Sequence, residues 1–122
     1  MFVKLDKTAF MVNWEHGTGP TGQRFTKCFL HELVHKDEEP TRDNVSTLPS
    51  YEGMAVCSKK DQFSKNKGRK KSLSRAISNH LVFPLEARLK FWDAYFKMQG
   101  VCYDSKKLAK TLGFMVYEKI GP

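Results

Sequence analysis

Long apolar runs are absent from this chain. Its longest uninterrupted apolar stretches are a handful of residues, whereas a membrane-spanning helix needs about 20. The first residues, from Met1 to Asp6, also lack the apolar core of a secretory signal. These absences argue against an integral membrane protein and predict a cytoplasmic one.

Cysteine is scarce as well. Cys28, Cys57 and Cys102 are an odd number and form no close pairs in the sequence. This pattern is typical of free thiols in a reducing compartment and argues against a disulfide scaffold. With 40% hydrophobic and 12% aromatic residues, the 122-residue chain has the composition to bury a core as a single domain, residues 1–122.

Acidic residues are nearly missing from one segment that is rich in cations. Between Lys59 and Arg75 there are eight cations and one acid, Asp61, so this segment carries +7 of the net charge of +8. The rest of the chain is close to neutral, and charge focused on one element indicates contact with a polyanion. The eight cations are Lys59, Lys60, Lys65, Lys67, Arg69, Lys70, Lys71 and Arg75.

Three segments are rich in strand-forming residues. They are residues 8–14, 25–35 and 51–57. A cluster of glycine and proline from Gly17 to Gly22 separates the first two and predicts a hairpin with a long loop. Residues 37–49 are polar and acidic and predict a second loop.

A helix is expected over residues 59–80, with Ser58 as its N-cap. Its apolar face would consist of Leu73, Ala76 and Ile77, with Phe63 and Leu81 along the edge. Lys67, Lys71 and Arg75 would project from the other side, at positions i, i+4 and i+8.

A second helix is expected after Pro84, ending before Gly100, with an apolar stripe in the core. The stripe consists of Leu85, Leu89, Trp92 and Phe96, joined by Phe91 and Tyr95. Residues 106–112 predict a third, short helix. Residues 114–120 suit either its extension or a fourth strand, and the strand is favoured. The predicted class is therefore α+β, a small antiparallel sheet packed with two or three helices.

One motif suggests metal chemistry. His31-Glu32-Leu33-Val34-His35 fits the pattern H-E-x-x-H. On a helix, His31 and His35 would bind zinc from one face, and Glu32 would act as the general base of a hydrolase. In a strand the two imidazoles would lie about 13 Å apart, too far to share a metal. The preceding turn and the alternation of apolar residues favour the strand.

The cationic helix has an ordinary interpretation, a solvated surface, and a functional one. No acid at i+4 balances Lys67, Lys71 and Arg75, so these residues repel one another by a few tenths of a kcal/mol per pair. A sequence that keeps such repulsion favours contact with a phosphate backbone. Arg69 and Lys70 lie at the edges of the apolar face, where their stems can pack.

A stretch of the chain also fits the pattern C-x3-D-x-F-x4-G-R-x3-L-x-R-A. The matching residues are Cys57, Asp61, Phe63, Gly68, Arg69, Leu73, Arg75 and Ala76, and the downstream residues are Arg88, Phe91, Trp92 and Tyr95. The pattern resembles a group of small, mostly uncharacterised proteins of tailed bacteriophages and prophages, in which a short sheet precedes it. The resemblance implies a phage origin, the cytoplasm of a bacterial host and a strand over residues 25–35. It implies no activity.

The sequence thus predicts a small, non-enzymatic phage protein without a cofactor. It would bind DNA or RNA, single- or double-stranded, through the helix over residues 59–80, mainly by phosphate contacts. One alternative is a phage-encoded inhibitor that docks this face on an acidic host protein of the defence or transcription machinery. A second alternative is a zinc hydrolase at His31, Glu32 and His35.

Overall fold

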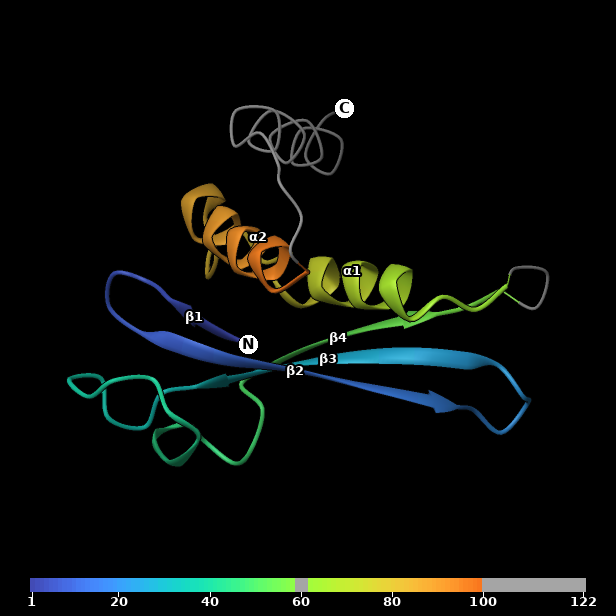
Figure 1. Ribbon diagram of the computed structural model, residues 1–122, viewed down its shortest axis with the longest axis horizontal. Helices are drawn as coiled ribbons and strands as arrows, with labels where there is room; N and C mark the ends of the chain where they lie inside the picture. The colour runs from blue at the N-terminus through green and yellow to red at the C-terminus, as the bar shows by residue number, and fades with distance from the viewer. Residues whose placement is uncertain (59–61, 100–122) are drawn as a thin grey trace.

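The structure consists of an antiparallel four-stranded sheet with both helices on one of its faces (Figure 1). This computed structural model describes residues 1–58 and 62–99. The strands follow one another in the order β1-β2-β3-β4. The element bounds are β1 Phe2–Lys4, β2 Ala9–Thr18, β3 Arg24–Glu32, β4 Tyr51–Val56, α1 Lys65–Ala76 and α2 Leu85–Gln99. The predicted α+β class is confirmed.

β2 and β3 form a long hairpin because their residues alternate between two environments. Phe10 and Val12 of β2 are buried in the core, as are Cys28 and Leu30 of β3. The register pairs Val12 with Leu30 and Trp14 with Cys28, so apolar side chains meet directly across the two strands. A shift of one residue would turn all of them away from the helices, and this fixes the register.

Two strand ends differ from the prediction. β2 continues to Thr18 because Gly17, expected in the loop, pairs with Phe25 of β3. A Cβ atom on Gly17 would lie 2.5 Å from the tip of the Phe25 ring, so the missing side chain makes room for the aromatic one. β3 ends at Glu32, three residues before the predicted end, where the chain turns into the following loop.

β1 is a strand that the sequence pattern does not predict. It pairs antiparallel with β2, with Val3 opposite Phe10. Val3 is the only buried residue of its three, which is too little alternation to mark a strand. The fourth strand of the sheet is therefore N-terminal. The helix predicted over residues 106–112 and the strand predicted over residues 114–120 lie outside the described residues.

α1 is shorter at both ends than the helix predicted over residues 59–80. Its N-cap is Ser64 and not Ser58, because the Ser64 hydroxyl accepts a hydrogen bond of 3.4 Å from the backbone N–H of Lys67. At the other end α1 stops at Ala76, and the next residue has already left the helical conformation.

The apolar face of α1 is buried as predicted, except at its edge. Leu73, Ala76 and Ile77 are at most 6% exposed. Leu81 is 97% exposed because the chain leaves the helix before reaching it, so its predicted place beside the core is wrong. Phe63 precedes α1 and is partly buried.

α2 follows Pro84 as predicted and packs an aromatic face on the rest of the fold. Phe91, Trp92 and Tyr95 are buried, together with most of Arg88. The remaining stripe residues, Leu85, Leu89 and Phe96, are only partly buried against the core. Neither α1 nor α2 is long and apolar enough to cross a membrane.

Phe83, just before α2, holds an aromatic cluster together. Its ring centroid lies 5.5 Å from that of Phe10, 5.0 Å from that of Tyr51 and 5.2 Å from that of Phe91, all in edge-to-face geometry. Such pairs contribute roughly 0.5–1.5 kcal/mol each beyond the burial of their surface. The cluster thereby joins β2, β4 and α2.

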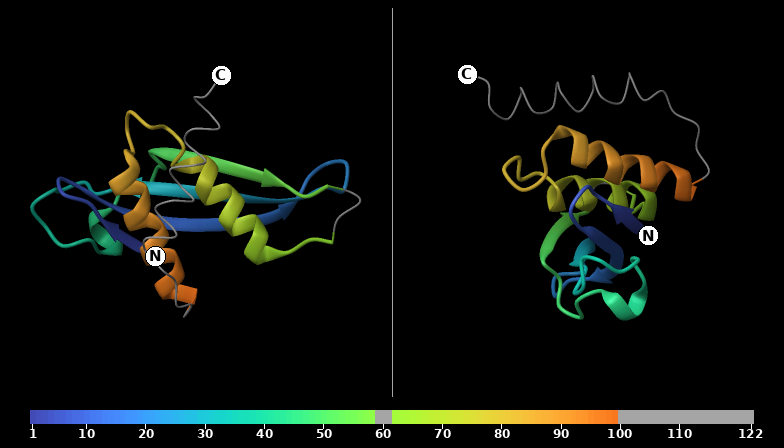
Figure 2. Two further views of the ribbon diagram at one scale, coloured as in Figure 1. Left: turned by 90° about the horizontal axis from the view of Figure 1, so that it is seen from above. Right: turned by 90° about the vertical axis from the view of Figure 1, so that its left-hand side faces the viewer.

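α1 lies over the sheet (Figure 2). Two glycines allow a close approach between them. A Cβ atom on Gly53 of β4 would lie 2.2 Å from the carbonyl oxygen of Ser72 and 2.4 Å from the backbone nitrogen of Ala76. A Cβ atom on Gly68 of α1 would lie 2.3 Å from the hydroxyl oxygen of Thr26 in β3. Any larger residue would therefore push the helix away from β3 or β4.

The segment between β3 and β4 forms the predicted loop, which lies below the sheet in Figure 1. It contains a short 3-10 helix, Arg42–Asn44. The buried Asn44 side chain holds the loop together, because it accepts from the backbone N–H of His35 and donates to the carbonyls of His35 and Glu39. The acidic residues are thereby fixed at this end of the molecule.

Replacing Gly53 with alanine is expected to lower the free energy of unfolding by roughly 1–3 kcal/mol, because the new methyl group meets backbone atoms that cannot rotate away. Urea denaturation followed by circular dichroism measures the change. Gly19→Ala is the matched control, since its nearest new neighbour, the Gln23 carbonyl oxygen, would lie 3.6 Å away. Equal stability changes in the two variants would contradict the close approach of α1.

Candidate nucleic-acid interface

Cations without acids make up the outer surface of α1. The helix carries six lysine and arginine residues and no aspartate or glutamate. Arg69 is partly buried, and the other five are exposed and form what we term the basic face: Lys65, Lys67, Lys70, Lys71 and Arg75. Lys59 and Lys60, predicted to belong to the same cluster, lie outside the described residues.

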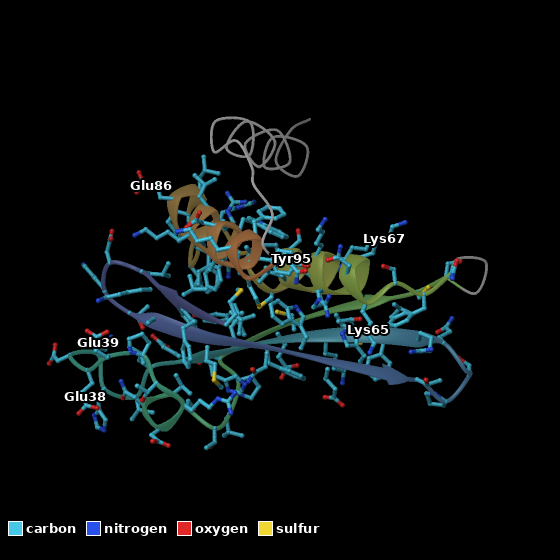
Figure 3. The ribbon with its side chains drawn as sticks, in the orientation of Figure 1. Glu38, Glu39, Lys65, Lys67, Glu86 and Tyr95 are labelled. Atoms are coloured by element: carbon cyan, nitrogen blue, oxygen red, sulfur yellow. The ribbon has the colours of Figure 1, made fainter. Side chains whose placement is uncertain are left out.

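Within the described part of the chain, no residue of the basic face forms an ion pair. The ion pairs found there are Lys90–Asp6 (3.0 Å) and Lys97–Asp93 (3.1 Å), both with lysines of α2. Glu38 and Glu39 of the acidic loop lie far from Lys65 and Lys67, toward the other end of the sheet (Figure 3). The described residues therefore leave the charge of the basic face unneutralised.

Part of the basic face borders the edge strand β4. Its members on this side of α1 are Lys67, Lys71 and Arg75. Lys67 and Lys71 line a cleft of about 380 Å³, whose other walls include Ala55 and Val56 of β4. The Arg75 guanidinium donates a hydrogen bond to the carbonyl oxygen of Met54. This part of the helix therefore presents its cations directly above the strand.

Arg69 is partly buried, and Lys70, although exposed, lies beside an aromatic ring of α2. The Lys70 ammonium lies 5.9 Å from the ring centroid of Phe96 in α2. The carbonyl oxygen of Arg69 accepts a hydrogen bond of 3.3 Å from the indole N–H of Trp14. The partial burial of its side chain makes Arg69 less available to a ligand than the exposed Lys65, Lys67 and Lys71.

A cluster that the sequence analysis missed lies beside the first turn of α1. His16 Nδ1 and the hydroxyl oxygen of the fully buried Thr26 are 2.8 Å apart, and the imidazole meets the Phe63 ring edge-to-face. The Arg24 guanidinium lies 4.2 Å from the centroid of the same ring. Arg24, which is exposed, thereby adds a further cation next to the basic face.

The surroundings of His16 favour its neutral form. Burial lowers the pKa of the imidazole, and the nearby charges of Arg69, Lys65 and Arg24 lower it further. Alternation in the hairpin could have placed His16 and Thr26 on the helix side of the sheet. The contact of His16 with Phe63 joins residues that are distant in sequence, so no local signal marks it.

The H-E-x-x-H motif does not lie on a helix. His31 and Glu32 belong to β3, as the strand interpretation predicts, and His35 lies beyond its end. His31 Nδ1 is 2.9 Å from the carbonyl oxygen of Ser46, and Glu32 accepts a hydrogen bond of 3.3 Å from the Thr8 hydroxyl. Within residues 1–58 and 62–99, no three histidine, cysteine or acidic side chains are grouped to hold a metal. The zinc-hydrolase alternative lacks the geometry that it requires.

Comparison of the chain with known protein families, with curated proteins and with solved structures gave no match. The functional argument therefore depends on the geometry and charge of the described residues.

The imidazole of His16 is expected to titrate below its ordinary pKa of 6.5, which NMR of the ring protons measures. As the pH falls below 6.5, the unfolded chain takes up this proton before the folded chain does, so the free energy of unfolding decreases until the pH passes the folded pKa. A His16→Gln variant should lose less stability over the same window. A midpoint at or above 6.5 in the native protein would contradict the environment described for His16.

Proposed function

We propose that this protein binds nucleic acid through the basic face of α1, mainly by contacts to phosphates. The observation that carries the proposal is a helix with six cations and no acid, whose exposed members form no ion pair within the described residues. Phosphate contacts of this kind supply affinity and orientation but little sequence preference. Arg24 extends the charged surface toward the β2–β3 hairpin.

The aromatic side chains near α1 favour contact with the phosphate backbone of the nucleic acid over stacking on its bases. The Phe63 ring is flanked by His16 and by the Arg24 guanidinium, and Tyr95 is buried, with its hydroxyl 2.7 Å from the Asn66 side chain. Stacking on single strands requires exposed rings beside the cations. A double-stranded ligand, tracked along its phosphates, is therefore the form of nucleic acid that we propose.

The setting that we propose is a bacterial cell infected by a phage. The resemblance of the segment from Cys57 to Ala76 to small phage proteins supports it. A protein that binds duplex phosphates without reading bases would cover or package nucleic acid, or compete with host proteins for it, and would need no catalytic residue.

The binding constant for duplex DNA is expected to fall steeply with salt. If the five residues of the basic face each contact one phosphate, the slope of log K against log salt concentration should be roughly −4 to −5. Replacing Lys67 and Lys71 together with glutamine should make the slope shallower by about 2, because two counterion-releasing contacts are lost. Fluorescence anisotropy with labelled duplexes of two unrelated sequences measures the slope and should give similar affinities.

The chain offers a control with the same change in charge. Lys90 and Lys97 are already paired with Asp6 and Asp93, so the double variant Lys90→Gln/Lys97→Gln should keep the native slope. Equal losses in the two double variants would show that total charge, and not the basic face, sets the affinity. Absence of binding at low salt would end the proposal.

A further inference from the structure

One border of the sheet is formed by β4, whose outer side pairs with no described strand (Figure 2). The strand Tyr51–Val56 contains neither proline nor lysine, the residues that proteins commonly use to protect such an edge. Open edges of this kind accept an extended segment of another chain as an additional strand. The chemistry on the two faces of β4 determines which segment fits.

The backbone N–H and C=O groups of three β4 residues point to the open side of the sheet. The Cys57 N–H, at the end of β4, donates to the carbonyl of Arg24 in β3. Because successive residues of an antiparallel strand point their backbone groups to opposite sides, those of Glu52, Met54 and Val56 point outward. The hydrogen bond from Arg75 to the Met54 carbonyl is consistent with this assignment.

The side chains of β4 divide into two chemically different faces. Gly53 and Ala55 are buried, and the Gly53 backbone meets α1. Met54 and Val56 are on the opposite face, which also carries the exposed Glu52, and they are 46% and 47% exposed. An added strand beside β4 would therefore have an apolar strip under one of its faces and α1 above the other.

The face toward α1 is cationic. Lys67 and Lys71 line a cleft together with Ala55 and Val56, and Arg75 reaches the backbone of the edge itself. Residues of an added strand alternate between its two faces. On one face they would meet these cations, and on the other they would meet Met54 and Val56.

We infer that β4 binds an extended segment of a partner protein in which acidic and apolar residues alternate. The segment adds to the sheet as a strand beside β4. Its backbone pairs with Glu52, Met54 and Val56, its apolar side chains cover the exposed strip, and its carboxylates face the cations of α1. This inference draws on the open edge and on the charge of α1, and it does not depend on nucleic-acid binding.

A second copy of this chain is a poorer occupant than an acidic segment. Pairing two β4 edges would bring Lys67, Lys71 and Arg75 of both copies to the same seam, and like charges oppose such an approach. In the free protein, Arg75 already bonds the Met54 carbonyl and so reduces the open groups of the edge. A carboxylate of the partner segment would draw this guanidinium away and free the carbonyl for pairing.

The test uses a short, end-blocked peptide of alternating glutamate and valine and measures its binding to the native protein by fluorescence anisotropy. A peptide of the same composition, with all glutamates before all valines, is the control for charge alone. The alternating peptide should bind at least about tenfold more tightly, because only it satisfies both faces at once. N-methylation of alternate backbone amides on its pairing side should cost about tenfold or more, since those donors are lost.

Protein variants and NMR locate the site. The double variant Lys67→Gln/Lys71→Gln should bind the alternating peptide more weakly than the native protein does. The control variant Lys90→Gln/Lys97→Gln should bind it with native affinity. The backbone amide signals of Glu52, Met54 and Val56 should shift on binding. Equal affinity of the two peptides, no effect of N-methylation, or shifts confined to α1 would each overturn the inference. Peptide binding without affinity for duplex DNA would refute only the proposed nucleic-acid function, and DNA binding without peptide binding would refute only the edge-strand inference.

Discussion

The contact between α1 and the sheet determines how the rest of the molecule is arranged. At Gly53 and Gly68 the helix and the strands approach so closely that no side chain fits between them. These two contacts fix the rotation of α1 about its own axis as well as its height above the sheet. Leu73 and Ala76 must then point into the core, and the side that carries Lys67 and Lys71 must face β4. Packing, and not local charge, therefore decides where the cations are displayed.

This arrangement holds α1 in a form that its own composition opposes. Its cations repel one another, and Lys65 and Lys67 stand in the first turn, where the positive end of the helix dipole disfavours them. The Ser64 cap and the buried apolar face offset these terms. Most helical stability in proteins comes from such tertiary packing. A surface charge that would weaken an isolated helix is thus tolerated because the sheet supports the helix.

The sequence predicted those parts of the fold that depend on local pattern. Strand-forming composition and the turn residues between the segments identified the three principal strands, and Pro84 marked the start of α2. The prediction from the sequence misplaced the N-cap of α1. Serine at either position 58 or position 64 can cap a helix, and only the folded chain distinguishes Ser58 from Ser64. The candidate site was predicted as a set of charges, but its geometry was not. The His16–Phe63 contact and the position of Lys71 beside β4 join segments that are far apart along the chain, and such contacts leave no periodic signal.

The fixed acidic loop has a consequence at a distance. The Asn44 hydrogen bonds hold the loop that carries Glu38 and Glu39 at one end of the sheet, while Lys65 and Lys67 of α1 lie toward the other (Figure 3). Among the described residues, such a separation of charge contributes a permanent dipole moment in addition to the net charge. Near a polyanion, the electric field exerts a torque on this dipole moment and turns the molecule until α1 faces the polyanion. The alignment acts over roughly a Debye length, about 10 Å at 0.1 M salt, so the molecule would arrive already oriented before any two atoms touch.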